Sequence, residues 1–260
     1  HMLKKYTFPL LSSCFLLLYS MSIYAKPQEK TLEKYVLTAK QHAEFCQQWA
    51  QFCTDGKADT LFQVKNNPHQ FYAIHALKLG QLQKEGQIFK LITQWDFSTY
   101  QSLSHAYWAM SDHHNAHEAL SIFPKLFPLN EQDDAIGIVQ TWSEGYSGGG
   151  LSEEVVDFVK LKPDGKYQQV FQNIPLSMYR MIRACFSEQQ YIESQGKCHD
   201  EYSLDSQILY VKPNTWQVKY HFRADFSPAS DTGTKPINLR KTYLLKDNRE
   251  DAIVFPETWN

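Results

Sequence analysis

The chain has no excess of charge of either sign. It contains 26 Lys and Arg residues against 28 Asp and Glu residues, which leaves a formal net charge of −2 over 260 residues. Proteins that bind nucleic acid or an anionic membrane surface usually carry a basic excess. The composition therefore supports neither partner, whereas the 14% of aromatic residues suits β-sheet and protein-contact surfaces.

Long apolar runs are also scarce. The run at the start, Phe8 to Met21, is shorter than the roughly 20 residues that a membrane-spanning helix needs. Two lysines precede this run and Ser22-Ile23-Tyr24-Ala25 follows it, ending in a small residue, an order typical of a secretory signal peptide. We therefore expect residues 1–25 to be a tag remnant, His1, and a signal peptide removed after Ala25. The protein is then periplasmic or secreted, with no stable membrane span.

A lipid anchor is the alternative at this end of the chain. Leu11-Ser12-Ser13-Cys14 fits the short pattern that precedes a lipid-modified cysteine in bacterial lipoproteins. A polar tether usually follows such a cysteine, but here Phe15 and three leucines follow it. The sequence therefore favours removal of the whole segment over anchoring through Cys14.

The remaining cysteines lack the C-x-x-C spacing that is typical of zinc sites. Cys46 and Cys53 form one local pair, and Cys185 and Cys198 form another. Four cysteines allow three connectivities, and in an oxidising compartment the local pairing is the simplest of them. We predict two local disulfides, Cys46–Cys53 and Cys185–Cys198, in preference to metal ligands or free thiols.

Regular alternation of strands with helices is absent as well. Apolar residues at three- and four-residue steps predict a helix from Thr31 to Cys53, and the region from Ser98 to Leu120 is ambiguous between helix and strand. Unbroken apolar and polar alternation makes Trp216 to Arg223 the clearest strand. Turn signals at Lys162–Gly165 and Lys212–Thr215 each predict a hairpin.

These patterns predict an α+β fold that is predominantly antiparallel β-sheet, with an N-terminal helix and two local disulfides. Residues 26–130 are expected to hold the helix and a mixed α/β segment, and residues 131–260 an antiparallel β-rich region. The alternative is that the two parts form one continuous domain.

The segment Gly145 to Gly150 offers one candidate nucleophile. It satisfies G-x-S-x-G, the turn that exposes the serine of α/β-hydrolases, and it is similar to the G-x-S-G-G segment of trypsin-like serine peptidases. The resemblance implies Ser147 as the nucleophile, which needs a histidine base and a carboxylate as well. Neither family's remaining pattern is present, because Thr38 to His42 has the wrong spacing and hairpins follow Ser147. A glycine-rich connecting or binding loop is the favoured interpretation.

The segment Asp112 to Glu118 contains a second candidate. In a helix, His113 and His117 would lie one turn apart and could bind zinc or copper with help from an acidic neighbour. The segment lacks the H-E-x-x-H order that places a general base beside the metal. Exposed histidines are the favoured interpretation, so no metal or cofactor is predicted.

The third candidate is a surface. Polar residues alternate with core residues along the strand from Trp216 to Arg223, and glycines allow another chain to approach closely. Tyr, Trp and Arg are the residue types that most often anchor protein interfaces. The predicted binding residues are Tyr146, Gly148, Gly149, Trp216, Lys219, His221 and Arg223.

Taken with export, these candidates favour a bacterial envelope protein that binds another protein and is not an enzyme. The most concrete form is an inhibitor or immunity protein against a toxin or a cell-wall-degrading enzyme. The alternatives are a serine hydrolase that uses Ser147 and a metal-dependent hydrolase that uses His113 and His117.

The first prediction concerns export. We expect the protein isolated from its producing cells to begin at Lys26 and to carry no lipid, because Ser22-Ile23-Tyr24-Ala25, which ends in a small residue, forms the cleavage site. Intact-mass measurement and detergent partition test this together. A mass that begins at an acylated Cys14 would contradict it.

Overall fold

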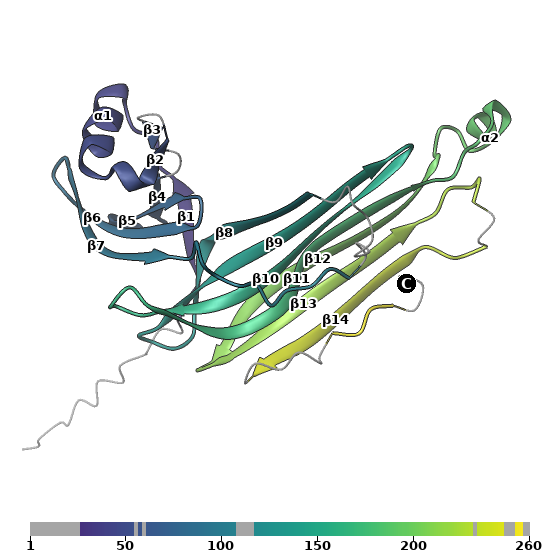
Figure 1. Ribbon diagram of the computed structural model, residues 1–260. Coiled ribbons are helices and arrows are strands. Elements are labelled where there is room, and N and C mark those ends of the chain that lie inside the picture. The colour runs from purple at the N-terminus through teal and green to yellow at the C-terminus, as the bar shows by residue number, and fades with distance from the viewer. Residues whose placement is uncertain are drawn as a thin grey trace, which may run out of the picture.

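The computed structural model describes residues 27–54, 57–58, 61–107, 117–230, 233–246 and 253–256, and these residues form mainly antiparallel strands (Figure 1). The expected signal peptide and His113 lie outside these residues. None of the helices in the described ranges is long and apolar enough to cross a membrane.

Twelve strands of the described residues form one sheet in the order β14-β13-β12-β11-β10-β9-β8-β1-β4-β5-β6-β7. Neighbours pair antiparallel throughout, and β8 to β14 follow one another along the chain as a meander. The strands are β1 (Lys30–Lys34), β4 (Leu61–Val64), β5 (Asn67–His75), β6 (Lys78–Glu85), β7 (Ile88–Asp96), β8 (His117–Pro128), β9 (Asp134–Tyr146), β10 (Gly149–Leu161), β11 (Tyr167–Arg183), β12 (His199–Lys212), β13 (Thr215–Asp225) and β14 (Ile237–Lys246).

The predominance of antiparallel sheet is therefore confirmed. Both expected hairpins are present: Leu161 pairs with Tyr167 across the β10–β11 turn, and Lys212 pairs with Thr215 across the β12–β13 turn. The strand predicted from Trp216 to Arg223 lies within β13, and its apolar residues are buried while its polar residues face outward. The alternation identified this strand because only one of its faces is covered.

The helix predicted from Thr31 to Cys53 is wrong at its start. Residues Lys30–Lys34 form β1, because Leu32 pairs with β4 and buries its side chain there. The helix α1 (Ala39–Gln48) begins later, after the N-cap Thr38, which forms a reciprocal capping box with Gln41. A short 3-10 turn, η1 (Ala50–Phe52), and a small ribbon of β2 (Cys53–Thr54) and β3 (Lys57–Ala58) complete this part.

Both predicted disulfides are present. Cys46–Cys53 links α1 to β2 with a Cα–Cα distance of 5.8 Å, and Cys185–Cys198 joins the chain on either side of α2 (Glu188–Glu193) at 4.9 Å. Disulfides persist in oxidising compartments, so both bonds are compatible with a protein that works outside the cytoplasm.

The largest core is centred on Trp216, which is fully buried. Its ring centroid lies 4.7 Å from that of Phe171, 4.8 Å from that of Phe158 and 5.6 Å from that of Phe127. These rings come from β8, β10 and β11, so strands distant in the sheet order meet at the side chain of one β13 residue. A separate cluster of phenylalanines lies between α1 and the strands β5 and β7, and includes Phe45 of α1, Phe52, Phe71 and Phe89.

Two irregular segments help to cover the sheet. Residues 98–107, here called the strap, have neither helical nor strand structure, and they hydrogen-bond to β10 and β11. Residues 253–256 lie against β13 and β14, where Phe255 contacts the rings of Tyr107 and Phe222. Lys241 of β14 points to the same side and donates to the Val254 carbonyl at 3.1 Å.

Candidate functional site

The glycine motif forms a tight hairpin turn. β9 ends at Tyr146 and β10 begins at Gly149, so Ser147 and Gly148 are the two turn residues, and both are exposed. Gly148 has φ +84°, a conformation that residues with a side chain rarely adopt. A Cβ on Gly149 would lie 2.4 Å from the carbonyl oxygen of Met181 and 2.3 Å from the Tyr146 ring. Glycine at 149 thus lets the turn pack directly on β11.

The loop between Cys185 and Cys198 exposes large apolar side chains beside this turn. Phe186 is 72% exposed, Tyr191 60% and Ile192 66%. The loop is well ordered internally, because the Ser187 side chain caps α2 by accepting from the Gln190 N–H and the disulfide joins its two ends. In Figure 1, α2 projects beyond the ends of the long strands, at the opposite end of the molecule from α1.

Arg183 connects the turn to the loop. Its Nε donates to the Cys185 carbonyl at 2.7 Å, and its guanidinium carbon lies 5.3 Å from the centre of the Phe186 ring. Its aliphatic stem contacts Gly148, where a Cβ would meet Cδ of Arg183 at 2.6 Å. A hollow of about 360 Å³ lies between the turn and the loop, and its lining includes Gly148 of the turn and Phe186 and Tyr191 of the loop. We call the combined surface of Tyr146, Gly148, Phe186, Tyr191 and Ile192 the tip surface.

Tyr146 anchors the turn to this surface. Its hydroxyl donates to the Met181 carbonyl at 2.7 Å, and burial raises the pKa of the phenol. The ring is nevertheless 43% exposed and can contact a partner. Tyr146, Gly148 and Gly149 were expected in a binding site from the sequence, whereas Phe186, Tyr191 and Ile192 were missed. Apolar residues between paired cysteines in a polar segment were the available signal.

The surroundings of Ser147 differ from those of a hydrolase nucleophile. In α/β-hydrolases the serine turn passes from a strand into a helix, but here it joins two antiparallel strands. No described residue hydrogen-bonds to the Ser147 hydroxyl. His199 lines the same hollow as Gly148 without such a bond. The local geometry therefore favours the connecting or binding loop.

The polar row predicted on the strand from 216 to 223 lies on the open face of β13. Lys219 and Arg223 are exposed, and His221 is half-buried between them. Trp216 belongs elsewhere, because its indole is fully buried and donates to the Pro128 carbonyl at 2.7 Å. The structure thus brings Lys219, His221 and Arg223 together and places Trp216 in the core.

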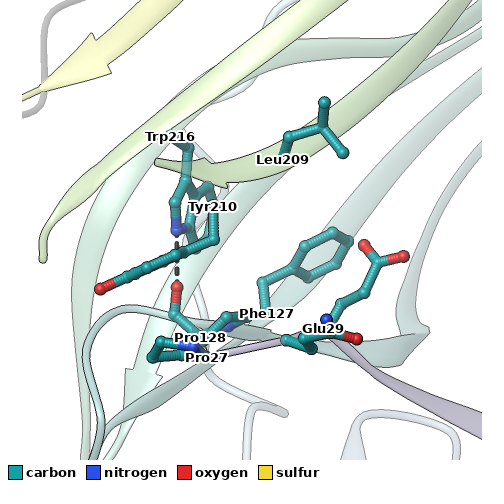
Figure 2. A pocket seen from close by; sticks show the side chains of 8 residues that line it. Pro27, Glu29, Phe127, Pro128, Leu209, Tyr210 and Trp216 are labelled. Carbon is teal, nitrogen blue, oxygen red and sulfur yellow. Dashed lines mark hydrogen bonds between the residues drawn. The ribbon is translucent and has the colours of Figure 1, made fainter. Parts of the chain in front are cut away.

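A second hollow, of about 270 Å³, lies where the first described residues pass the end of β8 (Figure 2). Its walls are largely apolar and include Phe127, Pro128, Leu209 and Tyr210. Glu29, which also lines it, forms an ion pair with Lys125 at 2.8 Å. This hollow borders the Trp216 core and contains no set of groups suited to acid–base chemistry.

Two fully buried carboxylates under the strap would be obvious candidates for catalysis. Asp157 of β10 accepts from the Leu103 N–H at 2.8 Å, the Tyr100 hydroxyl at 2.9 Å and the Ser104 hydroxyl at 2.9 Å. It also accepts from the Asn173 N–H at 2.8 Å. Both carboxylate oxygens are therefore occupied. Burial and the Asp157 charge together raise the pKa of the Tyr100 phenol, which stays a hydrogen-bond donor.

Glu153, four residues before Asp157 on β10, also accepts a hydrogen bond from the strap. Its Oε2 accepts from the Tyr107 N–H at 2.7 Å, and Tyr107 donates its hydroxyl to the Asn173 carbonyl. The His105 N–H donates to the Asn173 side chain at 3.0 Å. These contacts hold the strap in place and leave the carboxylates enclosed beneath it.

The predicted histidine pair is only partly within the described residues. His117 is the first residue of β8, and His113 lies outside them, so a site made by both stays a prediction. Among the residues that the structure does describe, no group of three or more His, Cys, Asp or Glu side chains could hold a metal ion.

No family model, curated protein or solved structure matches this chain. The interpretation of the site therefore depends on its own geometry. That geometry offers an apolar tip surface on a disulfide-closed projection, a polar sheet face and a buried structural carboxylate network.

We predict that substitutions in the turn from Gly145 to Gly150 affect stability to different extents. Gly149→Ala should lower the free energy of unfolding by about 1–3 kcal/mol, because its Cβ would overlap backbone and ring atoms. Gly145→Ala is the matched control, since a Cβ there meets nothing within 4 Å. Ser147→Ala should be silent. Urea unfolding measures all three, and covalent labelling of Ser147 by a fluorophosphonate would contradict the non-catalytic interpretation.

We also predict that Asp157→Asn lowers the free energy of unfolding by about 3 kcal/mol, because an amide cannot accept from all the donors of the strap. Asp225→Asn removes an exposed carboxylate from β13 and should change stability by less than about 0.5 kcal/mol. Urea unfolding gives the comparison, and protease cleavage within residues 98–107 should become faster only in the first variant. Equal stability of the two variants would show that the strap does not depend on Asp157.

Proposed function

We propose that this protein binds another protein in the cell envelope without catalysing a reaction. In the most concrete form it is an inhibitor or immunity protein that occludes a toxin or a cell-wall-degrading enzyme. The observation that carries the proposal is the tip surface, where Phe186, Tyr191 and Ile192 are each at least 60% exposed on one short loop.

Apolar exposure at this density has a physical cost that a partner would remove. Burying one such side chain fully is worth about 1.5–3 kcal/mol. Aromatic residues are also the types most enriched among the energetically dominant residues of protein interfaces. The tip surface therefore has the composition of an interface centre, with Tyr146 at its margin.

The loop is also arranged to bind at low entropic cost. The Cys185–Cys198 disulfide, the α2 cap and the Arg183 contact with Phe186 restrict the loop before any partner arrives. A surface that is already ordered loses less conformational entropy on binding. A rigid projection with apolar side chains fits a concave site, and an enzyme's substrate cleft is such a site.

Charge contributes little to the selectivity of this surface. Glu188 and Glu193 are exposed on α2, and the basic residues Arg183 and Lys197 flank them. The balance of two acidic and two basic side chains means that shape and apolar contact select the partner. Export is compatible with this role, since both disulfides suit an oxidising compartment.

Site-specific photocrosslinking in the producing cells tests the proposal. A photoreactive phenylalanine analogue at Ile192 should capture one envelope protein, and the same analogue at Ile88 should not. Ile88 is 63% exposed, close to the 66% of Ile192, but it lies on β7 at the other end of the sheet order.

The captured protein is then purified, and its affinity and activity are measured. Phe186→Ser with Ile192→Ser should weaken binding about 30-fold or more, as expected when residues at an interface centre are lost. The control pair Ile88→Ser and Ile92→Ser should bind as the wild type does. Unchanged affinity of the tip variant, or a captured enzyme that remains fully active in the complex, would contradict the proposal.

A further inference from the structure

The open face of β12, β13 and β14 contains a shallow hollow of about 380 Å³ whose lining includes the cations Lys219 and Arg240 and one carboxylate, that of Asp205. It lies on the opposite face of these strands from Phe222 and Tyr220, which are buried. We call it the basic hollow and define it by its outward side chains, Asp205, Gln207, Lys219, His221, Arg240 and Thr242.

Strand register places these side chains in two adjoining rows. Gln207, Lys219 and Thr242 are direct neighbours across the three strands in one row. Asp205, His221 and Arg240 are direct neighbours in the next row. Lys219 and Arg240 are therefore diagonal neighbours, roughly 7–8 Å apart at the backbone. Both have long side chains that can converge on a single group.

The two cations of the hollow have no anionic partner of their own. Neither Lys219 nor Arg240 makes an ion pair or a side-chain hydrogen bond with any residue that the structure describes. The carboxylate within the lining, that of Asp205, is paired with Arg223. His221 is held in place by Asn238, whose Oδ1 lies 2.7 Å from Nε2. The hollow thus presents Lys219 and Arg240 to solvent, and no described carboxylate forms an ion pair with either of them.

We propose that the basic hollow binds an acidic glycan, with Lys219 and Arg240 on its carboxylate or phosphate group. A guanidinium donates two parallel hydrogen bonds to either group, and a lysine ammonium adds a third from the side. The amide of Gln207 and the hydroxyl of Thr242 supply the neutral donors and acceptors that sugar hydroxyls require.

The lining favours a glycan over other macromolecules. All six side chains that define the hollow are polar, whereas the centre of a protein interface is apolar, as it is in the tip surface. Nucleic acid would place a row of phosphates across this face, where Asp205 at one side of the hollow and Glu201 and Asp225 further along the strands would repel them. A glycan with one acid group per unit matches an isolated pair of cations.

Titration calorimetry of the purified protein tests the proposal with defined probes. The probes are an oligogalacturonate, a phosphorylated oligosaccharide of the same length and a neutral oligosaccharide of that length. Wild-type protein should bind at least one acidic probe and not the neutral one. The double variant Lys219→Gln with Arg240→Gln should bind it about tenfold more weakly or worse, because two charge-assisted contacts are lost.

The matched control is Lys34→Gln with Lys90→Gln, which removes the same charge from exposed positions on β1 and β7. This control should bind as the wild type does. The assignment would be overturned if both double variants bound the acidic probe equally weakly. It would also be overturned if the protein bound inorganic phosphate but no acidic oligosaccharide, or if it bound an oligoglutamate of the same charge equally tightly. Binding of neither acidic probe would overturn it as well. The result is independent of the tip surface, which none of these substitutions alters.

Discussion

The structure depends on how a long antiparallel sheet covers its own apolar face. Helices do little of this work, because α1 packs over the β4–β7 part and α2 projects away from the sheet (Figure 1). Strands instead meet around Trp216, where rings from β8, β10 and β11 converge on one indole. The indole N–H is satisfied by the Pro128 carbonyl, so this large side chain is buried without an unpaired donor.

Another part of the sheet's apolar face is covered by the strap, residues 98–107, which has no regular secondary structure. Such a segment brings backbone N–H groups that need acceptors, and β10 supplies them through Asp157 and Glu153. Burial of a carboxylate is costly unless hydrogen bonds replace its hydration. Here the donors of the strap and the acceptors of the sheet satisfy each other. A buried carboxylate and an irregular segment would each be unfavourable alone, but their mutual hydrogen bonds make them stable together.

The sequence predicted the elements whose pattern is local. Alternation identified β13, turn residues identified the β10–β11 and β12–β13 hairpins, and cysteine spacing identified both disulfides. Prediction from the sequence failed where pairing with a distant strand determines the local structure. The apolar spacing around Leu32 is compatible with a helix, but pairing with β4 and β8 makes a strand there. The candidate site was predictable to the same extent. Tyr146, Gly148 and Gly149 belong to a local sequence motif, whereas the exposure of Phe186 and Ile192 follows from the projection of their loop, which the sequence does not show.

The position of Lys241 bears on how the protein avoids aggregation. β14 is the last strand of the sheet among the described residues, and a free edge of this kind can recruit the strand of another molecule. Lys241 faces the buried side of that edge, where it reaches the Val254 carbonyl and lies 6.0 Å from the centre of the Phe222 ring. An added strand would have to cover this ammonium group and give it no new counterion. The same contact that fastens residues 253–256 thus discourages edge-to-edge aggregation.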